Sequence, residues 1–476
     1  MPQSTNTMAT YLAILILSFL VLLVQAGPAS CQRPQQGSGR TPSIGTVNAT
    51  LIFIDFPDAK HNETVEEAMR DVSLSDTMDF FKESSFGIFN LNISMPSTTW
   101  YRMKSPSYSY NYNLNLSMET HQKLAQDALE AVGTNVSFKE TQLLIIAAAR
   151  TATIIGSISA TGFFSPVAAD GTIMSNVINI SVDFYAASTS KSSIGLTTAF
   201  AMGIRGQCPP SIGVDAGDAY LGGYSPMCDA TPLAPDYLAR QKWALGWLDE
   251  MTEVTCVGTD NGSTLSLPFN KNLTLTAVES NTTSSTNSSA PQTKLAILPL
   301  PGTKSLYVEA RTKSGADADA CLSGSGAGGV LLYLADSSGL DGPSDPVQIV
   351  DLQPHSVPTG CGSERQGYLD LLGLSGKDQV TSYLVPNTGV RIRVLSENSD
   401  LDEFVIIFES GISEESLETP SVTSVIATAT KSTLPSALST SPALPTGQGS
   451  VGSRCWDINP WSAVIIIFFT IAASVW

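Results

Sequence analysis

The sequence predicts an α/β (α+β) domain followed by an all-β sandwich domain. Between residues 46 and 182, short apolar runs typical of strands alternate with amphipathic runs typical of helices. This alternation favours a mixed sheet with helices packed on it. Between residues 294 and 410, six short apolar runs follow one another with turn residues between them and no helical pattern, which is typical of a β-sandwich.

The elements of the first domain are predicted in order from their periodicity. The run 46–56, TVNATLIFIDF, is β-branched and apolar, and Pro57 ends it, so it is a buried strand. Apolar residues at helical spacing make 117–132 the clearest amphipathic helix. The remaining expectations are helices at 72–81, 194–202 and 235–249, strands at 88–94, 142–149 and 177–182, and a loop or hairpin at 156–171.

The two ends predict a secreted, surface-anchored protein. Residues 1–26 contain an apolar core and the small-residue site Val24-Gln25-Ala26, the pattern of a cleaved signal peptide. Residues 454–476 end in the short apolar run AVIIIFFTIAASVW, preceded by small residues and a polar spacer, the pattern of a GPI-attachment signal that is removed. We expect the chain on the outer face of the plasma membrane or in the cell wall, with the membrane as a partner through the anchor.

Charge and composition restrict the partners further. The formal net charge is -18 and the pI is about 4.5, which argues against nucleic acid because phosphate binding needs a basic face. Residues 412–453 are rich in Ser, Thr and Pro and predict an O-glycosylated stalk. Asn-x-Ser/Thr sequons predict N-glycosylation at Asn48, Asn62, Asn92, Asn115, Asn135, Asn179, Asn261, Asn272, Asn281 and Asn287.

The cysteine count fits the oxidising secretory route. Loss of Cys455 with the anchor signal leaves six of the seven cysteines, an even number that suits three disulfides. Cys208–Cys228 and Cys321–Cys361 are the local guesses, but six cysteines allow 15 connectivities. The disulfide candidates are Cys31, Cys208, Cys228, Cys256, Cys321 and Cys361.

Three stretches resemble secreted zinc peptidases of the immune inhibitor A and gametolysin kind. The first is an apolar helix ending Met-Gly-Ile, a loop, a Tyr-Ser-Pro-Met turn and a segment closing on Lys-Trp-Ala-Leu-Gly-Trp-Leu-Asp, within residues 194–249. The others are a strand ending in Asp-Phe-Pro-Asp at 55–58 and the run FFKESSFGIFNLNISM at 80–95. The resemblance implies a zincin-like metallopeptidase domain, with the Met-turn residue Met227 beneath the metal.

The zinc motif of that family is degenerate here. Aligning Gly203 with the family's glycine puts Leu196 and Phe200 at the two histidine positions, Thr197 at the glutamate position and Gly206 near the third ligand. Leucine, phenylalanine and glycine have no lone pair for a metal, and threonine is a poor general base. The three histidines, His61, His121 and His355, are far apart in sequence. No catalytic residue is therefore assigned and no cofactor is expected.

Calcium remains an alternative, because Asp215, Asp218 and Asp229 lie in the loops after this helix, although a turn rich in Asp and Gly explains them equally well.

Seven segments follow from these patterns: a signal peptide (1–26), a disordered lead-in (27–44), a metallopeptidase-like domain (45–258), a glycosylated linker or loop (259–292), a β-sandwich (293–411), a stalk (412–453) and the anchor signal (454–476). We expect a surface protein that has lost zinc and catalysis and binds an extracellular protein, peptide or wall polymer. The alternatives are a zinc metalloendopeptidase with non-standard ligands, another hydrolase, and a structural cell-wall glycoprotein.

Overall fold

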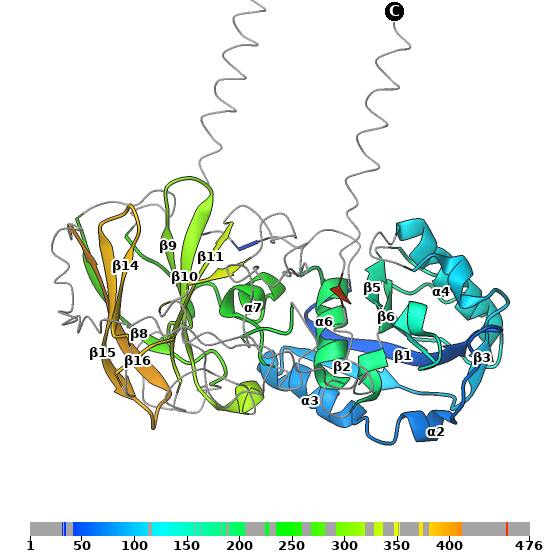
Figure 1. Ribbon diagram of the computed structural model, residues 1–476. Helices are drawn as coiled ribbons and strands as arrows, with labels where there is room; N and C mark the ends of the chain where they lie inside the picture. Colours follow the sequence, from blue (N-terminus) through cyan, green and yellow to red (C-terminus); the bar gives the residue numbers. More distant parts are fainter. Residues whose placement is uncertain are drawn as a thin grey trace, which may run out of the picture.

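A parallel α/β sheet region is followed by antiparallel β-sheets, so the chain is mixed α/β with a β-rich C-terminal part (Figure 1). The computed structural model describes residues 31, 33–34, 41–112, 117–156, 158–162, 164–180, 182–186, 190–204, 224–227, 235–258, 268–280, 292–318, 328–336, 347–350, 352, 371–374, 380–411 and 454–455. Within these residues, no helix combines the length and the apolar character needed to cross a membrane.

The first sheet has seven strands in the order β17-β5-β6-β4-β1-β2, with β3 also paired to β1. Strand β1 runs parallel to β2, β3 and β4, and β4 runs parallel to β6, whereas β5 is antiparallel to β6. The strands are β1 (Gly45–Asp55), β2 (Phe89–Ser94), β3 (Trp100–Arg102), β4 (Leu143–Ala148), β5 (Ile158–Gly162), β6 (Asn176–Ile180) and β17 (Arg454–Cys455).

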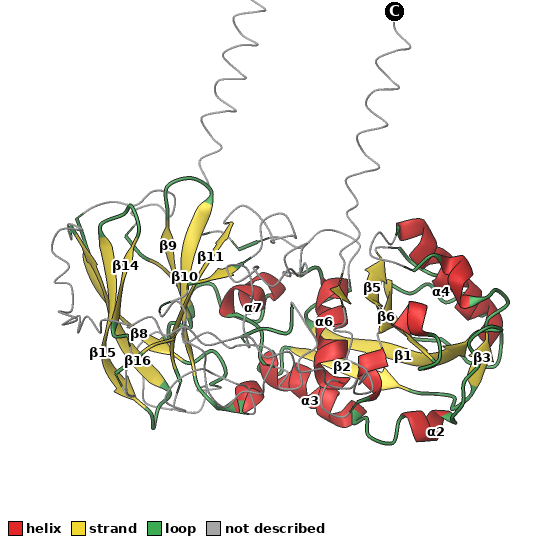
Figure 2. Cartoon of the chain, viewed as in Figure 1, coloured by secondary structure: helices red, strands yellow, loops and turns green. Residues whose placement is uncertain are grey.

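Helices cover both faces of this sheet, as the right half of Figure 2 shows. Alternate residues of β1 enter different cores, with Leu51 and Phe53 in one and Ile52 and Ile54 in the other. Helices α3 (Leu74–Ser84) and α6 (Ser190–Met202) contribute to the first core, and α4 (Met118–Val132) contributes to the second. The shorter elements here are α2 (Val65–Ala68), η1 (Ser107–Tyr110), α5 (Thr153–Gly156) and η2 (Val182–Tyr185).

Local sequence explains where these helices begin and end. Ser117 caps α4, because its Oγ accepts a hydrogen bond from the Thr120 N–H at 3.1 Å. Gly133 follows at a φ of 57°, which glycine adopts with little strain. The predicted strands and helices of this region are confirmed to within a few residues, and the predicted hairpin region supplies β5.

The C-terminal part holds two sheets whose facing side chains form one core. The six-stranded sheet has the order β12-β11-β10-β9-β7, with β13 paired to β11, and the four-stranded sheet has the order β14-β15-β16-β8. Leu298, Leu306 and Leu332 from the six-stranded sheet pack with Ile392 and Phe408 from the four-stranded sheet. The strands are β7 (Val254–Cys256), β8 (Asn270–Thr276), β9 (Leu295–Pro299), β10 (Lys304–Arg311), β11 (Gly329–Asp336), β12 (Gln348–Ile349), β13 (Leu371–Leu372), β14 (Ser382–Val385), β15 (Val390–Asn398) and β16 (Glu403–Ser410), with η5 (Gly315–Asp317) after β10.

The α/β region and the six-stranded sheet share a core. Trp243 of α7 (Ala239–Leu245), Ile297 of β9 and Tyr333 of β11 belong to the same buried cluster as Phe200 of α6. Helix α7 is shorter than the predicted helix 235–249, because the chain before it is extended and Gly246 ends it at a φ of 82°. The two parts of the chain are therefore packed together through α7.

A network of buried ion pairs borders this junction and hydrogen-bonds to α7. The Arg311 guanidinium lies 2.7 Å from Glu279 Oε1, 3.0 Å from Glu309 Oε1 and 2.5 Å from Asp317 Oδ2, and all four side chains are fully buried. Glu309 Oε2 also accepts a hydrogen bond from the Ala239 N–H at 2.7 Å, at the start of α7. Burial, together with repulsion from Asp317, raises the pKa of Glu279. The network fixes α7 to β10 and η5.

A second buried pair lies beside it. Lys242 Nζ is 2.5 Å from Asp236 Oδ2, and their side chains are 0% and 1% exposed. Lys242 also lies over the ring of Phe86, 4.6 Å from its centroid. Phe86 belongs to the turn between α3 and β2, so this pair joins the turn to α7.

Three predicted boundaries differ from the structure. Arg454 and Cys455 were expected in an anchor signal that is removed, but they form β17 and pair with β5. Thr41 and Ser43 were expected in a disordered lead-in, but both are buried, and Ser43 Oγ donates to the Leu245 carbonyl at 2.7 Å. The predicted linker 259–292 contains β8, which pairs with β16. Its Ser/Thr/Asn-rich composition hid the alternation of Leu273 and Leu275 with polar residues, which is the pattern of a strand.

Candidate functional site

The two positions expected to hold zinc-binding histidines lie in the protein core. Leu196 is 0% exposed and Phe200 is 1% exposed, and both belong to the cluster that α6 forms with α3 and the sheet. Apolar side chains packed in this way stabilise the helix against the sheet. They offer no lone pair to a metal, so this part of α6 is structural.

The hydroxyl of Thr197, which the resemblance aligns with the glutamate of the zinc peptidases, forms hydrogen bonds within its own helix. Its Oγ1 lies 2.8 Å from the Ser193 carbonyl oxygen and 3.3 Å from that of Ile194, and the residue is fully buried. A hydroxyl that donates to the preceding turn is a common arrangement for threonine inside a helix. Thr197 is thus held away from any proton-transfer role.

The predicted Met-turn lies in the same core cluster as Leu196 and Phe200. Met227 is fully buried, and its N–H donates to Ser225 Oγ at 3.3 Å. Ser225 Oγ in turn donates to Gln241 Oε1 in α7 at 2.8 Å. The turn therefore supports α7 as well as the core. The other predicted site residues, Gly206, Asp215, Asp218 and Asp229, lie outside the described residues, as does His355.

His121 is separated from α6 by the sheet. It lies on α4, in the core on the opposite face, with Nδ1 2.6 Å from Tyr112 Oη and Nε2 3.3 Å from the Val177 carbonyl oxygen. Burial lowers the pKa of His121 to about 4, so it is a neutral core histidine at physiological pH. It cannot reach the positions of Leu196 and Phe200.

A polar cluster that the sequence did not single out lies at the carboxyl end of β1. The Asp55 carboxylate is fully buried, with His61 Nδ1 at 2.6 Å and Arg102 Nε and Nη2 at 2.5 and 2.7 Å. Burial by itself raises the pKa of Asp55, but hydrogen bonds from Arg102 and His61 outweigh it and hold that pKa below its usual value. The ring of Trp100 stacks on His61 with centroids 5.6 Å apart.

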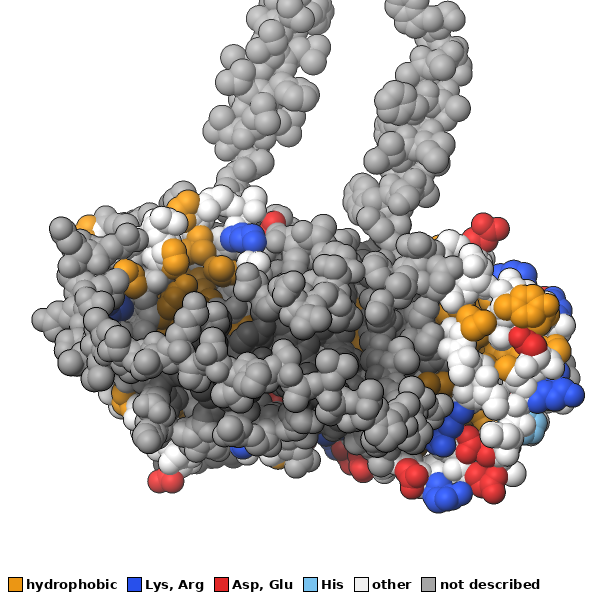
Figure 3. Space-filling view, in the orientation of Figure 1, with side chains coloured by type: hydrophobic (Ala, Val, Ile, Leu, Met, Phe, Trp, Pro, Cys, Tyr) orange, Lys and Arg blue, Asp and Glu red, His pale blue; other side chains and the backbone are white. Residues whose placement is uncertain are grey.

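This arrangement orients His61 and Arg102 while leaving both in contact with solvent. Their side chains are 39% and 41% exposed. A carboxylate on Nδ1 fixes the imidazole ring and directs Nε2 outward, where it can donate, accept or transfer a proton. Figure 3 shows side chains of both charges gathered at the lower right, around the places of α2 and β3 in Figure 1. A signal was present in the sequence, since Asp55 closes a buried strand and His61 follows six residues later.

The six sequon asparagines among the described residues differ in exposure. Asn179 is fully buried in β6 and donates to the Ile155 carbonyl at 3.4 Å, so the prediction of a glycan there is at odds with the packing. Asn48 is half-buried and accepts from Asn92 Nδ2 at 2.9 Å. The exposed sites are Asn62, Asn92, Asn135 and Asn272. The other four, Asn115, Asn261, Asn281 and Asn287, lie outside the described residues.

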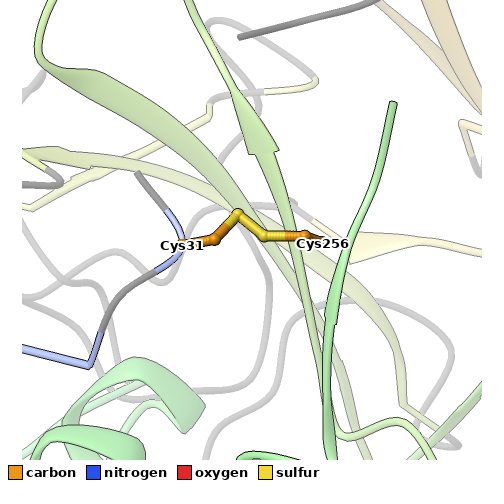
Figure 4. Close-up of a disulfide and its surroundings, with 2 residues drawn as sticks. All are labelled: Cys31 and Cys256. Carbon is orange, nitrogen blue, oxygen red and sulfur yellow. A yellow bond between two sulfur atoms is a disulfide. The ribbon is translucent and has the colours of Figure 1, made fainter. Parts of the chain in front are cut away.

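Cys31 and Cys256 form a disulfide (Figure 4). Their Cα atoms are 6.2 Å apart, and their sequence separation is 225. The bond joins the N-terminal lead-in to β7 at the edge of the six-stranded sheet. Both cysteines were disulfide candidates, and the sequence left their pairing open. The local guesses Cys208–Cys228 and Cys321–Cys361 lie outside the described residues.

The described residues contain no group of three or more His, Cys, Asp and Glu side chains placed to hold a metal ion. Neither models of known protein families nor the curated proteins give a match to this chain. Among the described residues, the polar cluster at Asp55 and the core positions of α6 are the features considered below.

Proposed function

We propose that this chain is a non-catalytic cell-surface glycoprotein that binds an extracellular protein, peptide or wall polymer. In this proposal a zincin-like metallopeptidase scaffold precedes a β-sandwich module, and the scaffold has lost its zinc and its catalysis. A signal peptide, a glycosylated stalk and a GPI anchor place the protein on the outer face of the plasma membrane or in the cell wall.

One observation carries the proposal. The helix that would hold the metal has Leu196 and Phe200 packed in the core, and Thr197 donates into its own helix. A zinc peptidase of this kind needs two histidines one turn apart on that helix, and a carboxylate beside the first of them. A scaffold that retains its helix and its Met-containing turn but places apolar side chains at those positions is better suited to binding than to hydrolysis.

A cleavage assay tests the proposal. The purified chain, released from its membrane anchor, is incubated with casein in the presence and absence of a chelator, beside a Thr197→Ala variant. We expect no cleavage in any of these samples. Cleavage that disappears with the chelator would support the alternative of a metalloendopeptidase with non-standard ligands. Cleavage that survives the chelator would support a hydrolase of another class.

A further inference from the structure

The polar cluster lies at the carboxyl edge of the α/β sheet, on the β3 side of β1 and next to the point where the strand order reverses. The connection from β1 to β2 includes α3, on one face of the sheet, whereas the connection from β3 to β4 includes α4, on the other face. The strand order therefore reverses between β1 and β4. In such sheets, ligands bind beyond the carboxyl ends of the strands at this reversal. Asp55 ends β1, and Arg150 follows the end of β4 by two residues.

Donor groups remain available at this edge. Arg102 uses Nε and Nη2 on Asp55, and His61 uses Nδ1 on the same carboxylate. Within the described part of the chain, Arg102 Nη1, His61 Nε2 and Lys60 Nζ have no hydrogen-bond partner, and Lys60 is exposed. Because one buried carboxylate orders Arg102 and His61, a ligand that binds them incurs little further loss of side-chain entropy.

The acidic side chains nearby are already engaged. Asp58 accepts hydrogen bonds from the Ser107 N–H and Oγ, both at 2.7 Å. Glu63 Oε1 lies 3.5 Å from Arg150 Nε. On α2, Glu67 accepts from the Thr64 N–H at 2.8 Å. Glu66 is bound by the Thr98 hydroxyl, and this hydrogen bond lowers the pKa of Glu66. These carboxylates therefore have local partners, whereas Arg102 Nη1, His61 Nε2 and Lys60 Nζ have none among the described residues.

We propose that the carboxyl ends of β1 and β3 form a binding site for an oxyanion, a carboxylate or phosphate group on the ligand. Arg102 Nη1 donates to it, Lys60 adds positive charge, and His61 lies beside Arg102 on the same carboxylate. Charge-assisted hydrogen bonds from a guanidinium are among the strong contacts that oxyanions form with proteins. This inference rests on the proposed function, which says that the ligand is bound and not cleaved. It adds the location of the binding site and the chemical class of the ligand.

The experiment follows the histidines by NMR. The chain has only three, so selective ¹⁵N,¹³C-histidine labelling gives few signals, and a His61→Gln variant assigns that of His61. Acetate and inorganic phosphate are titrated separately, with sodium chloride at matched ionic strength as the reference. We expect the His61 signal to shift saturably with at least one oxyanion, and the buried His121 signal to stay in place. The anion that saturates at the lower concentration identifies the group.

Variants separate binding from general ionic effects. Arg102→Gln is expected to lower the affinity for the oxyanion by about tenfold or more, the usual effect of losing a charge-assisted hydrogen bond. Since Arg102 also pairs with Asp55, Lys60→Gln provides a second variant that breaks no described side-chain contact, and we expect it to weaken binding by about twofold to fivefold. Lys271→Gln, an exposed lysine on β8, is the matched control and leaves the affinity unchanged.

Two results would count against this binding site. A His61 shift that is linear, or equal in chloride and in oxyanion, would overturn the inference. So would unchanged affinity in both folded variants, Arg102→Gln and Lys60→Gln. Either result leaves the proposed function standing, whereas chelator-sensitive cleavage of casein removes the proposed function without affecting the titration.

Discussion

Replacing Lys242 by methionine should strongly destabilise the junction between α7 and the six-stranded sheet. The Lys242 and Asp236 side chains are 0% and 1% exposed, and their charged atoms are 2.5 Å apart. Methionine fills a similar volume and can still contact Phe86, but it leaves the Asp236 carboxylate buried without its cation. Breaking a buried pair from one side costs about 3–5 kcal/mol of the free energy of unfolding.

Guanidinium chloride denaturation, followed by tryptophan fluorescence, measures this effect. Trp243 and Trp247 are fully buried beside the junction, so they report on its opening. A double variant, Lys242→Met with Asp236→Asn, removes both charges and should recover much of the lost stability, because a neutral pair of similar shape is often tolerated. Lys271→Met, at an exposed site on β8, is the control and should behave as wild type.

Two results would show that the buried pair does not stabilise the junction in this way. A Lys242→Met variant as stable as the Lys271→Met control would mean that the pair adds nothing to the junction. A double variant less stable than the single one would mean that Asp236 stabilises the fold without its cation, for example through its hydrogen bond from the Tyr237 N–H.

Three further predictions concern other parts of the chain. Because the Cys31–Cys256 bond closes a loop of 225 residues, a Cys31→Ser, Cys256→Ser double variant should lose about 5 kcal/mol on the chain-entropy model, measured as above. Burial lowers the pKa of His121 from 6.5 to about 4, so the unfolded chain binds the proton more readily. The resulting contribution of about 3 kcal/mol to the free energy of unfolding should be present above pH 6.5 and lost as the pH falls towards 4. A His121→Gln variant should lack this pH dependence of the free energy of unfolding between pH 4 and 6.5. An unchanged pH dependence in the variant would contradict the prediction. Glycopeptide mass spectrometry should find Asn179 unoccupied and Asn62 occupied, and a glycan on Asn179 would show that β6 packs differently.

Periodicity predicted most of the fold because burial repeats along each element. The run that became β4 is apolar throughout, and all six of its residues are buried between two helical layers. Helix α4 was predicted to within one residue, since its apolar spacing and its Ser117 cap both lie within 117–132. Local patterns of this kind depend only on neighbours in sequence.

The junction and the polar cluster could not be predicted in the same way, because their partners are distant in sequence. Arg311 and Glu279 lie 32 positions apart along the numbered sequence and meet only when β10 and the end of β8 come together. Asp55 becomes part of a polar cluster only through its ion pair with Arg102, which lies on β3, a strand that pairs with β1. The absence of histidines and carboxylates from α6 was readable directly from the sequence, and the structure adds that Leu196 and Phe200 are core residues.

The zinc content of the purified, deglycosylated protein distinguishes a metal-free binding protein from a metallopeptidase. Inductively coupled plasma mass spectrometry gives the number of zinc atoms per chain after gel filtration in metal-free buffer. We expect a value well below one, because Leu196 and Phe200, which the resemblance aligns with the two histidines, are buried apolar side chains. One zinc atom per chain, retained through gel filtration and removed by a chelator together with caseinolytic activity, would contradict it.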